Sequence, residues 1–130
     1  RRISKKYSGK SRTEPAGREA IMITVHIYYT GAEGSALRFA QEMTESGAVE
    51  KIRAEAGNLG YAYYPSLEDP ETVLLVDSWQ DQAAIDAHHQ SPMMEVIAAL
   101  REKYDLHMRV ERLVADTAGL PEQDAAFVRE

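Results

Sequence analysis

Aromatic and imidazole side chains gather in three neighbouring stretches of this sequence and are its main candidates for chemistry. Tyr61 and Tyr63 stand on one predicted strand, Trp79 ends the next, and His88 and His89 follow on a short predicted helix. Aromatic rings can stack on a planar ligand, and a histidine can exchange a proton near neutral pH. Each residue also has a purely structural interpretation, since strand aromatics are commonly core or interface residues and a histidine near a helix end is commonly a hydrogen-bonded structural group.

Helical spacing leaves open which of the two histidines points inward. Ile85 is expected on the buried face of its helix, and it lies three residues before His88 and four before His89. Both spacings bring side chains together on one helical face. His26 and His107 stand on predicted strands without neighbouring candidates and are weaker candidates for catalysis.

Several other chemistries have no signature in the sequence. Cysteine is absent, which excludes disulfides, thiolate nucleophiles and cysteine-ligated metals, and fits a cytoplasmic location. The histidines have no metal-ligand spacing, and neither a phosphate-binding glycine loop nor a serine elbow is present. We therefore expect no metal and no cofactor.

The charge is unevenly distributed. The net charge of −6 combines +5 over residues 1–21 with −11 over the remaining 109 residues. Nucleic-acid binding by the main part of the chain is disfavoured, because its field repels phosphate. No apolar run reaches the roughly 20 residues that cross a bilayer, so no membrane partner is expected. We divide the chain into a basic N-terminal arm or leader (residues 1–21), one domain (22–114) and a C-terminal tail (115–130).

Hydrophobic periodicity predicts strands and helices in the order βαββαβ, with the second helical part made of two consecutive helices. Alternating or continuous apolar residues indicate strands, and apolar residues spaced three and four apart indicate helices. Asp81 is expected to cap the short helix, and Ser91 the next one. The predicted elements are strands at 22–30, 59–64, 72–79 and 105–114, with helices at 33–47 and 82–89 and a further helix that begins at 92. A second helical piece, with Val49, Ile52 and Ala56 on one side, is predicted to end at Gly57, and Pro121 is expected to start a last short helix.

This order is the split βαβ, or ferredoxin-like, arrangement of an α+β domain: a four-stranded antiparallel sheet with helices on one face. The third strand is nearly all apolar, so it is expected at the centre of the sheet, with apolar residues on both faces: Leu74 and Val76 on one, Val73 and Leu75 on the other. One of these faces has no helix to cover it. A bare apolar face of this kind is typical of an association surface. We therefore predict a homodimer in which two sheets pack face to face.

Two motifs give the sequence a family resemblance. The stretch RAEAGNLGY (residues 53–61) is similar to an Arg-x-Glu-Pro-Gly-Asn-x-x-Tyr segment, with Ala56 where proline is common. The stretch DSWQDQAAIDAHHQSP (residues 77–92) is similar to a Glu-x-Trp segment followed by Ala, His and Ser/Thr-Pro, and Trp79 and His88 occupy matching positions. Both motifs, in this order, resemble the antibiotic biosynthesis monooxygenase family over residues 22–114.

The resemblance implies a dimeric α/β barrel with a pocket between sheet and helices. Members of that family include cofactor-independent monooxygenases acting on phenols or quinols, quinol oxidases, an isomerase and haem-degrading enzymes. The haem-degrading branch is disfavoured, because it uses an asparagine on the first strand and the only asparagine here is Asn58. Met93 stands where many relatives have a second histidine.

The resemblance favours a cofactor-independent monooxygenase or quinol oxidase that acts on a small aromatic molecule with dioxygen. It implies that His88 is the acid–base residue, with Tyr61, Tyr63, Trp79 and His89 binding the substrate. Two alternatives stay open: a non-catalytic binding module for an aromatic metabolite, and a small-molecule isomerase. The isomerase would require a charged group such as Arg53 or Arg109 to face the pocket.

Overall fold

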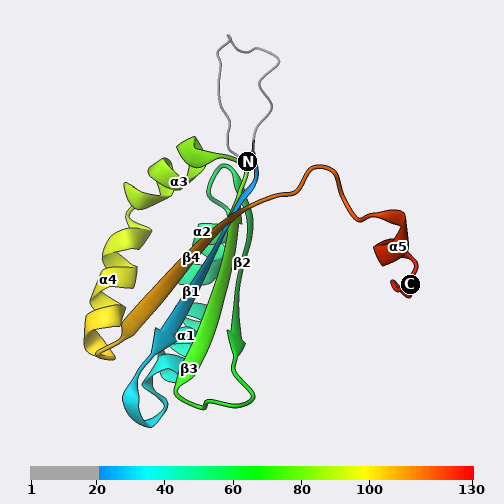
Figure 1. Cartoon of the computed structure of the whole chain (residues 1–130). Helices are drawn as coiled ribbons and strands as arrows, with labels where there is room; N and C mark the ends of the chain where they lie inside the picture. The colour runs from blue at the N-terminus through cyan, green and yellow to red at the C-terminus, as the bar shows by residue number, and fades with distance from the viewer. Residues whose placement is uncertain (1–20) are drawn as a thin grey trace.

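The computed structural model describes residues 21–130, and the predicted basic arm lies outside them except for its last residue. The predicted order βαββαβ is confirmed, and so are the second helical piece and the last short helix; among these residues, only one turn of 3-10 helix is additional (Figure 1). The elements are β1 (Ile23–Thr30), η1 (Ala32–Gly34), α1 (Ser35–Glu45), α2 (Ala48–Arg53), β2 (Asn58–Pro65), β3 (Thr72–Trp79), α3 (Gln82–His89), α4 (Met93–Lys103), β4 (His107–Val114) and α5 (Glu122–Ala125).

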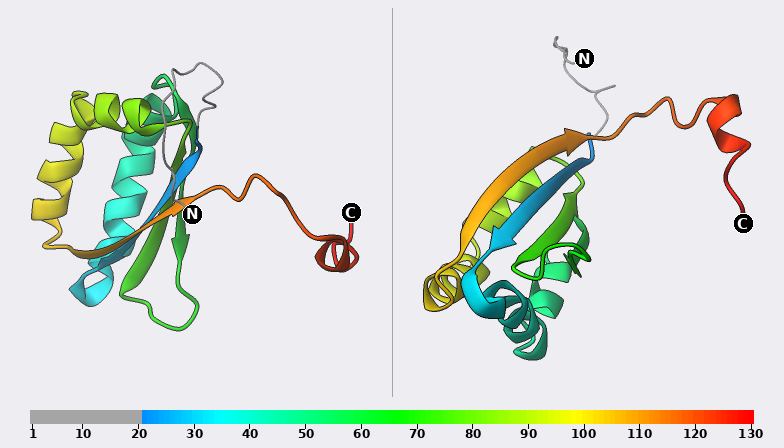
Figure 2. Two further views of the ribbon diagram at one scale, coloured as in Figure 1. Left: turned by 45° about the horizontal axis from the view of Figure 1, so that its top comes forward. Right: turned by 60° about the horizontal axis from the view of Figure 1, so that its bottom comes forward.

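The four strands form one antiparallel sheet in the order β2-β3-β1-β4. The central position predicted for β3 is confirmed, and its residues alternate between fully buried and half-buried along the whole strand. Helices α1 to α4 lie on one face of the sheet, which Figure 2 shows in two further views. The ferredoxin-like fold predicted from the element order is therefore correct.

The core lies between the helices and the inner face of the sheet. Strand residues at every second position point into it, because successive side chains of a strand face opposite sides. The helix predicted at 33–47 is confirmed as α1, and its Phe39 and Met43 are completely buried. Helix α1 ends at Glu45, and Gly47 follows in the left-handed conformation (φ 89°) that glycine adopts at low cost.

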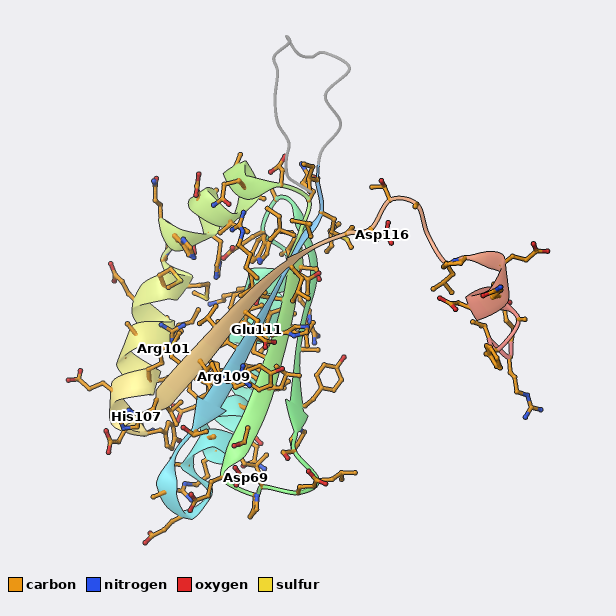
Figure 3. All side chains as sticks on the ribbon, viewed as in Figure 1. Asp69, Arg101, His107, Arg109, Glu111 and Asp116 are labelled. Atoms are coloured by element: carbon orange, nitrogen blue, oxygen red, sulfur yellow. The ribbon has the colours of Figure 1, made fainter. Side chains whose placement is uncertain are left out.

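No helix formed by residues 21–130 covers the opposite face of the sheet, as the pattern predicted. Leu74 and Val76 are half-buried at its centre, between neighbouring strands. Towards β4 the face becomes polar: Arg109 pairs with Glu111 at 3.0 Å and lies 4.0 Å from the centre of the Tyr28 ring. Figure 3 labels this ion pair at the sheet. This uncovered face, which mixes apolar and charged residues, is called the open face below.

Ser91 does not cap α4, contrary to the sequence prediction. Pro92 is the residue before the helix, and it makes no side-chain cap. The Ser91 hydroxyl instead donates a hydrogen bond to Oε2 of Glu55 at 3.1 Å. A hydroxyl has one proton to donate, and that of Ser91 goes to a residue 36 positions away in sequence. By contrast, the predicted Asp81 cap is confirmed, since its carboxylate accepts from the backbone N–H of Ala84 at 2.9 Å.

The tail beyond β4 leaves the sheet and carries α5 away from the other helices (Figure 1). Pro121 precedes that helix, as the sequence predicted. Leu120 and Phe127 are exposed on this tail. None of the helices formed by residues 21–130 has the length and apolar character that a membrane span requires.

Candidate functional site

A cavity of about 310 Å³ lies between the inner face of the sheet and helices α3 and α4. Most of its wall is apolar, and a few polar side chains interrupt that wall. Cavities of this kind are typical binding sites for small molecules. The apolar lining residues are Val25, Ile27, Leu75, Ile85, Met94, Ile97, Met108 and Val110, and the aromatic or polar ones are Tyr61, Asp77, Trp79, His88, His89, Arg101 and Arg112.

Trp79 and His88 form a stacked pair in the cavity wall. Their ring centres are 4.7 Å apart and the ring planes meet at 29°. The pair arises because Trp79 ends β3 on its inner face and α3, which begins shortly afterwards, brings His88 back over it. Both residues are buried, with exposed fractions of 1% and 7%. This packing holds the imidazole in a fixed orientation.

Glu55 fixes which nitrogen of His88 is available. His88 Nδ1 lies 2.7 Å from Oε1 of Glu55, so Nδ1–H donates to the carboxylate. Among residues 21–130, no group hydrogen bonds to Nε2 of His88, and Nε2 is the acceptor when the ring is neutral. Ser91 donates to the other carboxylate oxygen and so holds Glu55 in place. The arrangement leaves Nε2 as the nitrogen that can take a proton from a ligand.

A glycine turn brings Glu55 to α3. Gly57 has φ 83°, and its carbonyl accepts from the backbone N–H of Gln80 at 2.8 Å. A Cβ atom added at Gly57 would lie 2.5 Å from Cβ of Ala84, which is closer than real atoms approach. Both the conformation and the contact therefore require glycine. Because this turn packs directly on α3, Glu55 reaches His88.

Asp77 is a buried carboxyl group in the same wall. Its Oδ2 accepts from Nε1 of Trp79 at 2.7 Å, whereas its Oδ1 has no hydrogen-bond partner among the described residues. Burial raises the pKa of Asp77, and the hydrogen bond from Trp79 opposes this only in part. An unpartnered buried oxygen is uncommon in folded proteins and often marks a functional group.

Three tyrosine hydroxyls and one arginine lie close to the cavity, and of these residues Tyr61 and Arg101 line it. Arg101 donates from Nε and Nη2 to the hydroxyl of Tyr29, at 3.2 and 3.0 Å. The hydroxyls of Tyr61 and Tyr63 are 3.4 Å apart. Burial raises the pKa of all three tyrosines, most strongly that of Tyr61, so these phenols stay protonated at physiological pH. Arg101 lies on α4 at the side of the sheet (Figure 3).

The structure brings four of the five predicted site residues to the cavity. His88, His89, Trp79 and Tyr61 line it. Tyr63 does not line this cavity. It lines a separate hollow of about 220 Å³ between α1 and the β2 edge, and its hydroxyl contacts that of Tyr61.

The remaining basic candidates lie elsewhere. His26 and Arg109 are on the open face, where both contact Glu111. His107 is exposed on β4. Arg53 is half-exposed and donates to the backbone oxygen of Tyr61. The arginines named as a condition for an isomerase therefore do not line the cavity.

Four polar residues of the site were not predicted from the sequence. Glu55 and Asp77 stand inside the two motifs, so the motifs contained the signal. Arg101 follows the buried Ile97 by four residues on α4, which places both on one helical face. Arg112 follows Val110 by two residues on β4 and therefore shares its face. No group of three or more potential metal ligands occurs among residues 21–130.

Comparisons with known proteins concern the family and the fold of the chain. The family model described as antibiotic biosynthesis monooxygenase matches residues 22–100. No functionally curated protein matches the chain.

Similar solved structures share the fold at low sequence identity. SnoaB of Streptomyces nogalater, a cofactor-independent oxygenase, has a TM-score of 0.64 at 16% identity and covers 79% of this chain and 100% of its own. A protein of Pseudomonas aeruginosa has a TM-score of 0.64 at 24% identity, covering 76% and 98%. A protein of Deinococcus radiodurans named as a candidate antibiotic biosynthesis monooxygenase has a TM-score of 0.63 at 17% identity, covering 72% and 92%.

Proposed function

Because this chain belongs to the antibiotic biosynthesis monooxygenase family, we propose that it is a cofactor-independent monooxygenase or quinol oxidase for a small aromatic substrate. The observation that carries the proposal is the imidazole of His88, stacked on Trp79 in the wall of an apolar cavity and bonded through Nδ1 to Glu55. A base beside an aromatic surface suits a substrate with an acidic phenolic proton. The activity of SnoaB supports the same reaction type by similarity.

The chemistry needs a base because a phenolate gives up electrons far more readily than a phenol. In the proposed reaction, Nε2 of His88 takes the phenolic proton, and the anion passes electrons to dioxygen. Monooxygenation of a naphthol then yields a quinone and one water: the ring gains one oxygen atom and loses two hydrogen atoms, and dioxygen takes up four electrons. A quinol oxidase would instead remove two hydrogen atoms and release hydrogen peroxide.

The other cavity residues have binding roles in this proposal. Trp79, Tyr61 and His89 orient the ring, and Tyr63 supports Tyr61 from behind. The apolar wall keeps water from the anion and strengthens electrostatic interactions inside the cavity. Glu55 stabilises the imidazolium that forms when His88 accepts the proton, as carboxylates do for catalytic histidines.

We further propose that the open face joins two copies into a homodimer. Leu74 and Val76 leave an apolar centre at that face, which a second copy would cover. The cavity lies on the other side of the sheet, so the dimer contact would stabilise the sheet without lining the cavity.

Product analysis with and without dioxygen tests the proposed reaction. The purified protein is incubated with 1-naphthol or 1,4-dihydroxynaphthalene under air and under nitrogen, with a chelator present. We expect quinone only under air, at a rate above the spontaneous one. H88A should lower the rate about 100-fold, the lower range for loss of a general base. His107→Ala, at an exposed position of β4, should leave the rate unchanged.

Other results would select the alternatives. Tight binding without any conversion would identify a binding module. Conversion at equal rates with and without dioxygen would identify an isomerase. An H88A protein that keeps the full aerobic rate would refute the role of His88.

A further inference from the structure

Two arginines of the cavity wall have no carboxylate partner among residues 21–130. Arg101 and Arg112 both line the cavity, and neither lies within ion-pair distance of a carboxylate of the described chain. Two other basic residues have a carboxylate partner: Arg109 pairs with Glu111 at 3.0 Å, and Lys103 pairs with Glu42 at 2.8 Å. Within the described chain, the arginine charge that faces the cavity is therefore uncompensated.

Arg101 is the better placed of the two. It is half-buried, and Tyr29 orients it through the two hydrogen bonds at 3.2 and 3.0 Å. Burial raises the pKa of Tyr29, so this phenol is neutral and does not balance the guanidinium charge. Nη1 makes no hydrogen bond within the described residues. A charge removed from water without a partner is unfavourable, and an anion bound beside it would relieve that cost.

Asp77 does not supply the missing charge. It is the only acidic residue that the described chain contributes to the wall, and its Oδ2 is bonded to Trp79. On the inner face, Arg101 contacts Tyr29, whereas Asp77 lies opposite Val25, four residues earlier on β1. Four residues span roughly 13 Å along a strand. Asp77 and Arg101 therefore form no ion pair and lie at different positions along the cavity, while the Asp77 charge still acts on the Tyr29 hydroxyl.

Cavity size limits the ligand that can reach both positions. The volume of about 310 Å³ is twice the roughly 150 Å³ of a cavity that admits benzene. Two fused aromatic rings with a short substituent match this volume. A single ring would leave one end of the cavity unfilled.

We propose that the substrate is a two-ring phenol or quinol with a carboxylate, and that Arg101 binds the carboxylate. This inference rests on the proposed function for the identity of the reacting group. The carboxylate meets the guanidinium beside Tyr29, and the phenolic oxygen lies towards His88 and Asp77. Arg101 is then the residue that selects acidic aromatic molecules over neutral ones.

A matched ligand pair tests the proposal by binding alone. Wild-type protein is titrated calorimetrically with 5-hydroxy-1-naphthoate, whose hydroxyl and carboxylate stand on opposite rings, and with 1-naphthol, without dioxygen so that no turnover occurs. The chain has a single tryptophan, so its one indole N–H signal in NMR reports whether the ligand reaches Trp79. We expect the carboxylate to bind at least about tenfold more tightly, as a charge-assisted hydrogen bond predicts. The methyl ester of the same acid should bind like 1-naphthol.

Variants then assign the preference to Arg101. R101Q should reduce the ratio of the two affinities to below about threefold, without weakening 1-naphthol binding. R109Q, on the open face, should preserve the ratio. If R101Q does not fold, the comparison of the acid with its methyl ester still tests for an anion site in the wild-type cavity, and R112Q tests whether Arg112 provides that site instead. R101K should then retain part of the preference, because it keeps the charge.

Three results would overturn the proposal: equal affinity for acid and ester, an unchanged ratio in a folded R101Q protein, or no shift of the indole signal with either ligand. These outcomes are distinct from failure of the proposed function. A protein that oxidises 1-naphthol without preferring the acid would keep the function and refute the anion site. A protein that prefers the acid but never consumes dioxygen would do the reverse.

Discussion

Replacement of Glu55 by glutamine removes the charge beside His88 with little change in shape. The glutamine of E55Q could still accept from Nδ1–H through its amide oxygen, so the imidazole would keep its orientation. The wild-type contact is short, 2.7 Å between Nδ1 and Oε1, and the two side chains are only 7% and 18% exposed. Solvent therefore screens this pair weakly. The variant isolates the electrostatic part of the interaction.

The expected loss follows from the type of hydrogen bond. A bond to a charged group contributes about 1.5–3 kcal/mol and a neutral one about 0.5–1.5 kcal/mol, so the substitution costs about 1–1.5 kcal/mol. The substitution destabilises the imidazolium of His88 that forms in the reaction by this amount, relative to the neutral ring. Since about 1.4 kcal/mol corresponds to a tenfold change in rate, kcat should fall about tenfold with little change in KM.

Initial rates of oxygen uptake measure the effect. E50Q is a matched control, because Glu50 contacts Arg53 at the surface, where the glutamate is largely exposed. E55A should lose more activity than E55Q, since it also leaves Nδ1 of His88 and the hydroxyl of Ser91 without an acceptor. If E55Q turned over as fast as wild type, His88 would not gain charge in the rate-limiting step, and the proposed base would be wrong.

Two further predictions concern stability and assembly. Burial raises the pKa of Asp77, so the folded protein holds this proton more tightly than the unfolded chain does. The resulting stabilisation is fully present below the unfolded pKa of about 3.9 and is lost as pH rises through the folded pKa, at up to about 1.4 kcal/mol per pH unit. In urea unfolding, the free energy of unfolding of D77N should therefore rise relative to that of wild type as the pH increases above about 4, and a constant difference would contradict the raised pKa. For assembly, V76K on the open face should convert a micromolar dimer to monomers in sedimentation, whereas L67K at the exposed hairpin turn should not; a monomeric wild type would exclude the dimer.

Local sequence patterns were sufficient for the fold. The strand Thr72–Trp79 and the helix Gln82–His89 have the predicted bounds, because an apolar run and an Asp81 cap depend only on nearby residues. The Ser91 cap was wrong for the opposite reason. Its hydroxyl contacts Glu55, a partner that only the folded chain brings close.

The site was predictable only in part, since packing decides which polar residues share a cavity. Helical spacing could not choose between His88 and His89. Both line the cavity, but the contact with Glu55 distinguishes His88. Tyr63 was grouped with Tyr61 because the two stand two residues apart on one strand and so share a face. In the structure Tyr63 instead lines the hollow against α1, apart from the cavity. Arg101 belongs to neither motif, and its spacing from Ile97 indicates only a shared helical face; the contact with Tyr29 is visible in the folded chain alone.

Isotope labelling tests most directly whether this cavity supports cofactor-free oxygenation. The protein, freed of metals, converts 1-naphthol under isotopically heavy dioxygen, and the quinone is analysed by mass spectrometry. The proposed reaction predicts one heavy oxygen atom in each quinone molecule and the other in water, with this product reduced to the spontaneous level in H88A. A quinone without the label, or equal labelling in wild type and H88A, would contradict it.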